Sequence, residues 1–292
     1  MPELPEVETV VRGLRSVLPG RRIVEVRLGK TDFIEDPAAL EQHLTGSRVA
    51  GVRRYGKFLV FDLASSDRAD DGAGDGTANP LALLIHLGMT GQLVVCAADA
   101  EIAAHTHVFF ALDDGSELRY TDIRRFGSMR VLVNGASESA LGGLGLDALE
   151  ASEVEFIAKL RGRRARIKAL LLDQHVMRGM GNIYTDESLW RARIHPMRLG
   201  ANLKDEELRR LHRAVRGVLT EAIRLRGSSI SDYVDSEGQR GEFQRRHRAY
   251  QRKGKKCFRC GTLIRRAIVA GRSSYFCPKC QAAPRVRRPT KK

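Results

Sequence analysis

The first residues of the chain, Met1, Pro2 and Glu3, combine two groups that can do chemistry. Removal of Met1 would leave Pro2 with a free secondary amine, and such an amine can attack an electrophilic carbon to form an iminium. Because an α-amino group titrates at about pH 8, part of it is neutral at about pH 7. Glu3 would place a carboxyl beside the amine for general acid/base work. The same two residues also suit an ordinary helix start, and taken alone they favour that structural interpretation.

Four of the five cysteines form the strongest motif that stands without other support. Two Cys-x-x-Cys pairs are separated by 16 residues, a spacing typical of a structural site in which four thiolates bind one tetrahedral zinc ion. The predicted ligands are Cys257, Cys260, Cys277 and Cys280. Between the pairs, 263–269 and 274–276 predict a β-hairpin with Gly271 and Arg272 at its tip. A closed set of four thiolates argues against zinc as a catalytic metal.

Two further stretches place apolar or basic side chains in predicted turns. At 86–91, Met89 stands between two glycines, where it could fill the core or form an exposed apolar wedge. At 120–127, two arginines, of which Arg124 is the first, precede Phe126. That combination suits phosphate contact together with base stacking.

Weaker signals come from single positions. Lys57 stands at the mouth of a predicted strand, where a lysine is usually a solvated surface charge. Asn182 ends a Gly-x-Gly-Asn sequence before a predicted helix, a turn that could present N–H groups to a phosphate or simply connect two helices. His105 and His107 could bind a metal, but two such ligands on one strand without Cys or carboxylate partners favour a structural role.

The charge of the chain is divided unevenly between its halves. Residues 1–150 carry 15 Lys+Arg against 22 Asp+Glu, a net of −7, whereas residues 151–292 carry 35 against 13, a net of +22. Such asymmetry indicates a polyanionic partner for the second half, with nucleic acid favoured over an anionic membrane. No apolar run is long enough for a membrane span, and no signal peptide is visible, so we expect a cytoplasmic protein.

Hydrophobic periodicity indicates the elements that must position these residues. Apolar residues at helical spacing predict a helix over 3–18. Short β-like runs predict strands at 23–26, 49–52, 58–63 and 81–87, with a hairpin around 113–115. A Gly- and Asp-rich insertion at 64–80 and a small-residue stretch at 134–150 interrupt the pattern. Helical spacing then predicts helices near 153–160, 165–174, 183–193 and 205–226, so strands and helices fall in two separate domains.

Taken together, these stretches resemble the formamidopyrimidine-DNA glycosylase family, bacterial base-excision repair enzymes that act on oxidised purines. The motifs that carry the resemblance span nearly the whole chain: Pro-Glu-Leu-Pro-Glu-Val-Glu-Thr at 2–9, Lys57 before a strand, His-Leu-Gly-Met-Thr-Gly at 86–91, Tyr-Thr-Asp-x-Arg-Arg-Phe-Gly at 120–127, Gly-x-Gly-Asn-Ile-Tyr at 179–184 and the four-cysteine finger. The sister family, endonuclease VIII, typically continues its Pro-Glu start with Gly-Pro-Glu. Here Leu4-Pro5-Glu6 favours the formamidopyrimidine branch.

The resemblance implies an α+β fold of two domains: an N-terminal β-sandwich with an N-terminal helix, and a C-terminal helix–two-turn–helix domain with the zinc finger. We expect a catalytic domain at 1–134, a linker at 135–152, a helical DNA-binding domain at 153–250 with a lesion-covering loop at 228–247, a zinc finger at 251–281 and a basic tail at 282–292. Double-stranded DNA with oxidised purines would lie in the cleft between the domains. We also expect one structural Zn²⁺, a monomeric protein without membrane contact, and a location at the bacterial nucleoid.

The resemblance also implies a bifunctional glycosylase and abasic-site lyase. Pro2 would attack C1′ and displace 8-oxoguanine or a formamidopyrimidine through a Schiff base, while Glu3 handles protons at the sugar. The strand would then break by β,δ-elimination, with Lys57 donating a proton and contacting a phosphate, and Arg272 gripping phosphates and assisting δ-elimination.

The same resemblance assigns the DNA contacts. Phosphate-contact positions are occupied by His105, Arg163, Lys168 and Asn182. The gap left by an extruded nucleotide would be filled by Met89, Arg124 and Phe126, with Arg124 facing the orphan cytosine.

Several features depart from the family pattern or leave alternatives open. The 64–80 insertion is long, Ile123 stands where proline is common, and Ser231 stands where some members carry a lysine. The 228–247 loop would still cover the flipped base, with Ser228 as a contact. One alternative is a zinc-finger DNA-binding protein without catalysis, which would leave Pro2, Glu3 and Lys57 without a role. The other is the same chemistry on oxidised pyrimidines.

Overall fold

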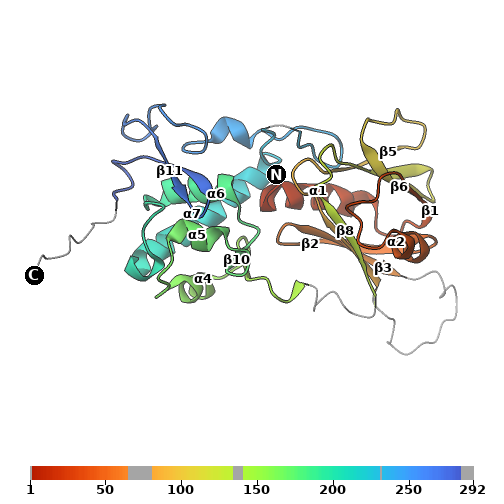
Figure 1. Ribbon diagram of the computed structural model, residues 1–292, viewed down its shortest axis with the longest axis horizontal. Coiled ribbons are helices and arrows are strands. Elements are labelled where there is room, and N and C mark those ends of the chain that lie inside the picture. The colour runs from red at the N-terminus through yellow and green to blue at the C-terminus, as the bar shows by residue number, and fades with distance from the viewer. Residues whose placement is uncertain (1, 65–80, 134–140, 231, 284–292) are drawn as a thin grey trace, which may run out of the picture. The chain divides into compact units, whose positions relative to one another are not determined.

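The computed structural model in Figure 1 describes residues 2–64, 81–133, 141–230 and 232–283. Met1, most of the predicted 64–80 insertion, Ser231 and most of the predicted 282–292 tail lie outside the described residues. The contacts divide the chain into two compact units, Met1–Gly143 with Ala222–Gln244 and Leu144–Glu221 with Arg245–Lys292. The segment Ala222–Gln244 thus groups with the first unit, although its sequence was expected to belong to the helical domain.

The first unit is built on two antiparallel four-stranded sheets. One sheet has the order β1-β6-β7-β5, from the strands β1 (Ile23–Leu28), β6 (Thr106–Leu112), β7 (Ser116–Thr121) and β5 (Gln92–Ala97). The other has the order β2-β3-β4-β8, from β2 (Arg48–Tyr55), β3 (Phe58–Ala64), β4 (Leu81–His86) and β8 (Ser128–Leu132). Residues from both sheets meet in one buried cluster, so the predicted β-sandwich is confirmed.

Helix α1 (Leu4–Val17) packs into that cluster through the apolar residues whose spacing predicted it. Val7, Val10, Val11 and Leu14 recur on one face of the helix and are fully buried. Helix α2 (Pro37–Leu44) was not predicted; the side chain of its N-cap Asp36 accepts a hydrogen bond from Ala39 N. Strands β5 and β8 were also missed, because runs of six and five residues carry too little periodicity to be separated from a loop.

The second unit is mainly helical, as expected. Its helices are α4 (Glu153–Leu160), α5 (Ile167–Leu172), α6 (Asn182–Ala192) and most of α7 (Asp205–Arg224). It also contains the short parallel strands β9 (Leu146–Asp147) and β10 (Met177–Arg178) and the 3₁₀ turn η1 (Gly200–Asn202). A second 3₁₀ turn, η2 (Phe243–Arg246), begins in the first unit and ends in the second. Within the described part of the chain, no helix is both long and apolar enough to cross a membrane.

The predicted hairpin between the cysteine pairs is present, with shifted bounds. Strands β11 (Arg265–Val269) and β12 (Arg272–Phe276) pair antiparallel, with Val269 opposite Arg272. The turn therefore contains only Ala270 and Gly271, which have φ of 50° and 69°. Positive φ at both central residues is the pattern of a type I′ turn, which matches the twist of the flanking strands. Arg272 is the first residue of β12 instead of part of the tip.

Candidate functional site

The N-terminus of α1 is buried. Pro2 is buried and Glu3, the N-cap of α1, is only 2% exposed. The N–H of Glu3 donates to Glu6 Oε2 at 2.8 Å, as in a capping box. This contact places the Glu3 backbone at the start of the helix and keeps Pro2 beside the positive end of the helix dipole.

The beginning of the 228–247 loop is anchored on the same helix. Ser228 N donates to Glu6 Oε1 at 2.7 Å, and the Tyr233 hydroxyl donates to the Glu6 carbonyl oxygen at 3.2 Å. Burial, followed by the nearby Glu6 carboxylate, raises the pKa of Tyr233 well above its usual value, so this hydroxyl keeps its proton. Gly227 has a φ of 78°, and a Cβ there would lie 2.7 Å from Glu6 Oε1. Glu6 therefore links the loop to Glu3, because it bonds to Ser228 and Tyr233 of the loop and accepts from the Glu3 N–H.

Lys57 lies in the two-residue turn that joins β2 to β3. Tyr55 pairs with Phe58 across this turn, and Gly56 takes the positive φ of 61° that begins it. Lys57 is 8% exposed, so it is not the solvated surface charge that a lysine usually provides. Burial, and then the nearby Lys57 charge, lower the pKa of His86 to about 4.

Arg54 connects this turn to α1. Its guanidinium donates to the Gly56 carbonyl at 3.2 Å and to Glu8 Oε2 at 2.8 Å. The side chains of Arg54 and Glu8 are 3% and 10% exposed, so the ion pair is shielded from solvent. Through it the turn that carries Lys57 is held against the helix that Pro2 and Glu3 begin.

A group of exposed side chains lies on two neighbouring loops of the first unit. Met89 is 38% and Phe126 is 57% exposed, and the Arg124 guanidinium lies 4.5 Å from the centre of the Phe126 ring. The exposure of Met89 excludes its interpretation as core filler. Ile123, which directly precedes Arg124 in the sequence, is 50% exposed as well.

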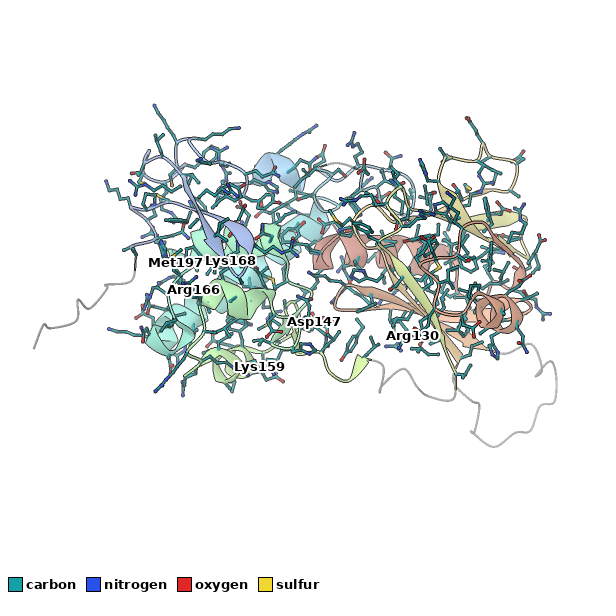
Figure 2. The ribbon with its side chains drawn as sticks, in the orientation of Figure 1. Arg130, Asp147, Lys159, Arg166, Lys168 and Met197 are labelled. Atoms are coloured by element: carbon teal, nitrogen blue, oxygen red, sulfur yellow. The ribbon has the colours of Figure 1, made fainter. Side chains whose placement is uncertain are left out.

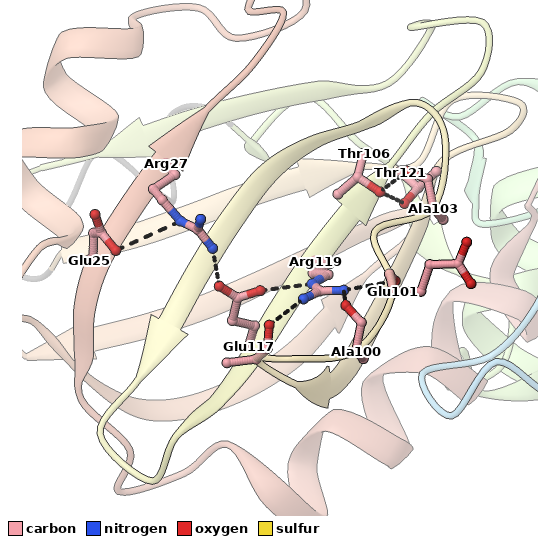
Figure 3. Close-up of polar contacts among 10 residues, drawn as sticks. Glu25, Arg27, Ala100, Glu101, Ala103, Thr106, Glu117, Arg119 and Thr121 are labelled. Carbon is pink, nitrogen blue, oxygen red and sulfur yellow. Dashed lines mark hydrogen bonds and ion pairs between the residues drawn. The ribbon is translucent and has the colours of Figure 1, made fainter.

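His105 is exposed and takes a φ of 66°, whereas His107 is buried with Nε2 3.2 Å from the Asp122 carbonyl oxygen. Neither histidine belongs to a metal-competent cluster among the residues that the structure describes. The segment before His105 is held by Arg119, whose guanidinium donates to the carbonyls of Ala98, Ala100 and Glu101 and to the Glu117 carboxylate (Figure 3). The two histidines therefore have separate environments.

Solvent exposure differs among three predicted site residues of the second unit, Arg163, Asn182 and Arg272. Arg163 and Arg272 are exposed, and Asn182 is half-buried as the first residue of α6. The buried Asn182 Oδ1 has no hydrogen-bond partner within the described ranges. Gly179, with a φ of 93°, forms part of the turn that leads into the helix.

Lys168, labelled in Figure 2, lies inside the second unit. Its side chain is 0% exposed, and Nζ donates to Asp186 Oδ1 at 2.7 Å and to the Ser273 carbonyl at 2.8 Å. Asp186 Oδ2 accepts from Tyr275 N at 2.9 Å. Burial raises the pKa of Asp186 to about 7, with the Lys168 ammonium opposing it. The phosphate contact expected for Lys168 stays a prediction that this enclosed geometry does not favour.

The four predicted zinc ligands converge. The sulfur atoms of Cys257, Cys260, Cys277 and Cys280 all lie within 4.8 Å of one another, and the cysteines are not disulfide-bonded. A tetrahedral ion with Zn–S bonds of about 2.3 Å requires sulfurs about 3.8 Å apart, so the residues present fit one zinc ion. The Trp190 indole N–H donates to Cys257 Sγ at 3.4 Å, and this contact orients a ligand from outside the coordination sphere.

Sequence reasoning missed the acidic pair in α6. Besides Asp186, Glu187 is buried and accepts hydrogen bonds from three consecutive N–H groups, those of Arg248, Ala249 and Tyr250. Both carboxylates thus hold segments that flank or form the zinc finger. The available signal was two adjacent acidic residues inside a helix whose other side chains are mostly apolar.

Three family models match the chain. The N-terminal domain of formamidopyrimidine-DNA glycosylase matches residues 1–129, the H2TH domain of the same enzyme matches 144–234, and a zinc finger found in FPG and IleRS matches 254–283. A "Formamidopyrimidine-DNA glycosylase" of Heliobacterium modesticaldum is 45% identical over 290 residues, covering 96% of this chain and 100% of its own. The enzyme of that name from Pelotomaculum thermopropionicum is 43% identical over 287 residues, with coverage of 96% and 99%.

Solved structures with the same fold include DNA complexes of Lactococcus lactis Fpg. The complex with DNA containing an abasic site has a TM-score of 0.84 and 33% sequence identity, covering 96% of this chain and 100% of that chain. A complex with DNA containing N7-benzyl-Fapy-dG has a TM-score of 0.84 and 33% identity, with coverage of 97% and 100%. A third, with DNA containing an oxidised pyrimidine, has a TM-score of 0.83 and 32% identity, with coverage of 97% and 100%.

Proposed function

This chain belongs to the formamidopyrimidine-DNA glycosylase family, and we propose that it excises oxidised purines from double-stranded DNA and then cleaves the strand at the resulting abasic site. The observation that carries the proposal is the start of α1. There the chain buries Pro2 and Glu3 side by side and anchors the 228–247 loop on Glu6. An ordinary helix start accounts for Pro2 and Glu3, but it does not account for the loop that Glu6 anchors beside them.

The first chemical step belongs to Pro2. After removal of Met1, the Pro2 amine attacks C1′ of the damaged nucleoside, and the bond between C1′ and the base breaks. The N-terminus of α1 disfavours a proton on a nearby amine, which keeps part of the nucleophile neutral. Glu3 handles the protons that move at the sugar as the ring opens and the iminium forms. No redox cofactor enters this sequence.

Strand cleavage follows from the iminium. A positively charged iminium acidifies the adjacent sugar carbon, so loss of a proton from C2′ expels the 3′ phosphate. Loss of a second proton, from C4′, then expels the 5′ phosphate in a second elimination. Lys57, held near α1 by the Arg54–Glu8 pair, is the proposed proton donor for the first elimination. Arg272 is the proposed phosphate ligand for the second.

The exposed side chains have a role in reaching the target. C1′ is inaccessible inside a duplex, so the damaged nucleotide must be extruded at a cost of about a few kcal/mol. Insertion of Met89 and Phe126 into the gap, with Arg124 facing the orphan cytosine, offsets that cost. Arg163, Asn182 and His105 would grip phosphates, which supplies affinity without reading sequence.

Zinc has a structural role in this proposal. Cys257, Cys260, Cys277 and Cys280 would hold one ion, which fixes the β11–β12 hairpin and with it Arg272. The enzyme is proposed to act as a monomer in the bacterial cytoplasm, at the nucleoid. A native mass of about two chains in light scattering would contradict the monomer.

The deciding experiment is borohydride trapping on a duplex with one 8-oxoguanine opposite cytosine, followed by mass mapping of the cross-link. A cross-link on Pro2 supports Met1 removal, the amine nucleophile and the lyase activity together. A cross-link on a lysine moves the nucleophile, and tight binding without any cross-link favours the non-catalytic alternative.

Excision rates must be measured to determine the lesion preference, because an Fpg of this fold has also been solved with DNA containing an oxidised pyrimidine. Single-turnover excision should be faster for 8-oxoguanine opposite cytosine than for thymine glycol opposite adenine. The reverse order would place the chain with oxidised pyrimidines.

A further inference from the structure

Asp122 follows β7 and is 0% exposed, and its carboxylate accepts four hydrogen bonds, three from two loops and one from Tyr120 of β7. Oδ1 accepts from the Thr90 hydroxyl at 2.5 Å and from Arg124 N at 3.2 Å. Oδ2 accepts from Gly127 N at 2.9 Å and from the Tyr120 hydroxyl at 3.1 Å. All four donors are neutral groups, and burial together with Asp122 raises the pKa of Tyr120, which keeps that hydroxyl a donor.

The backbone of Asp122 reaches a third loop. Its N–H donates to the His105 carbonyl at 3.0 Å, and its carbonyl lies 3.2 Å from His107 Nε2. One residue therefore contacts the turn that carries Met89, the loop that carries Arg124 and Phe126, and the loop that carries His105. Thr90 strengthens the first link, because its hydroxyl also accepts from Arg124 N at 3.1 Å.

The two loops around Asp122 approach so closely that side chains are excluded. A Cβ on Gly88, which has a φ of 57°, would lie 2.3 Å from the Phe126 carbonyl carbon. A Cβ on Gly127 would lie 1.8 Å from the Tyr120 hydroxyl oxygen. The turn at Met89 and the loop at Phe126 are thus in direct backbone contact, and a shift in one must move the other.

We propose that Asp122 is a positioning residue for nucleotide extrusion: its buried carboxylate holds Met89, Arg124 and Phe126 in the single arrangement that fills the gap in the duplex. This inference rests on the proposed function and adds a residue that is fully buried. A carboxylate is the group required here, because it accepts on both oxygens. A carboxamide would replace one of these oxygens by an NH₂ group. That NH₂ group would then face two other hydrogen-bond donors.

The test separates extrusion from sugar chemistry. We compare single-turnover excision of 8-oxoguanine opposite cytosine with cleavage of a preformed abasic site in the same duplex, where no base has to leave the stack. Asp122→Asn should lower the first rate by about 10- to 100-fold, the scale on which a misplacement of about 1 Å acts. Cleavage of the abasic site should change by less than about threefold on the same reasoning.

If the Asp122 variant does not fold, two variants of Thr90 provide a matched test. Thr90→Val keeps the shape and removes the hydroxyl, so excision should fall while abasic-site cleavage is retained. Thr90→Ser restores the hydroxyl and should behave as wild type. Asp113→Asn, at the exposed turn on the other end of β7, is the control for loss of a carboxylate and should leave both rates unchanged.

Equal loss of both activities in Thr90→Val and Asp122→Asn would overturn the inference, since it indicates general damage to the first unit. A wild-type ratio of the two rates in Asp122→Asn would overturn it as well. An inactive wild-type protein on both substrates would instead refute the proposed function, so the two failures are distinguishable.

Discussion

Replacing Lys168 by Met should uncouple the zinc-finger hairpin from the helices of the second unit. The ammonium of Lys168 joins Asp186 of α6 to the Ser273 carbonyl of β12, and Asp186 also accepts from Tyr275 N of the same strand. Met preserves the length of the side chain and removes the charge together with the hydrogen bonds to Asp186 and Ser273. The change therefore tests the polar link and leaves the packing nearly intact.

The expected cost follows from burial. The side chains of Lys168 and Asp186 are 0% and 1% exposed, so solvent cannot replace either partner. Removal of one partner from a buried ion pair costs about 3–5 kcal/mol, because the remaining group must either stay charged without its partner or change its protonation state. Lys168→Met combined with Asp186→Asn removes both charges and should cost less than the sum of the single variants, with a coupling energy of about 1–3 kcal/mol.

Trp190 provides the assay. It is the single tryptophan of the chain and packs in a cluster with Cys257 and Cys277, so its fluorescence reports unfolding of the second unit alone. Urea titrations of the zinc-loaded protein give the free energy for each variant. Arg161→Met is the control, since the Arg161–Asp205 pair is exposed and an exposed pair contributes only about 0–1 kcal/mol.

A second readout addresses the phosphate contact that the sequence predicted for Lys168. Each lost phosphate contact reduces the slope of log affinity against log salt by about 0.9. We expect an unchanged slope for Lys168→Met and a reduced slope for the exposed Arg163→Met. Two results together would refute the structural link: a stability loss below about 1 kcal/mol for Lys168→Met, and a double variant whose loss equals the sum of the two single losses.

Three further predictions concern zinc, pH and the Glu3 carboxyl. Chelation of zinc should shift the fluorescence of Trp190 and weaken DNA binding; an unchanged affinity would show that the finger does not contact DNA. His86 has a pKa of about 4 in the folded protein against 6.5 unfolded, so the unfolded state binds more protons between these values. Stability of the first unit should therefore fall as pH drops from 6.5 through 4, by roughly 3 kcal/mol in near-UV circular dichroism titrations, and His86→Asn should remove that component. Glu3→Gln should lose base excision and keep DNA affinity in a binding assay, and a wild-type excision rate would remove Glu3 from the mechanism.

Elements with strong local signals were predictable. The periodicity of Val7, Val10, Val11 and Leu14 is a property of the sequence itself, and it predicts both α1 and the face that α1 buries. The helices of the second unit follow from the same kind of pattern. Short elements such as α2, β5 and β8 were missed because a run of five to eight residues carries too little periodicity to separate it from a loop.

The site was predictable in its residue types and less so in its environments. Lys57 was expected at the mouth of a strand, yet its burial depends on the neighbours that a two-residue turn places around it. Lys168 belongs to a predicted helix, yet its partners Asp186 and Ser273 lie 18 and 105 residues away. Asp122 was part of a recognised motif without any assigned role, because one of its partners, Thr90, is 32 residues distant.

The sequence alone determined the family, the zinc ligands and the identity of the proposed nucleophile, since motifs and cysteine spacing depend on residue order. Only the tertiary structure decided which polar groups are enclosed and which are exposed. Met89 and Phe126 reach solvent while Asp122 and Lys168 do not, although all four stand in polar or mixed stretches. The physical reason is that burial and hydrogen bonding depend on distances across the fold, and chain separation does not encode those distances.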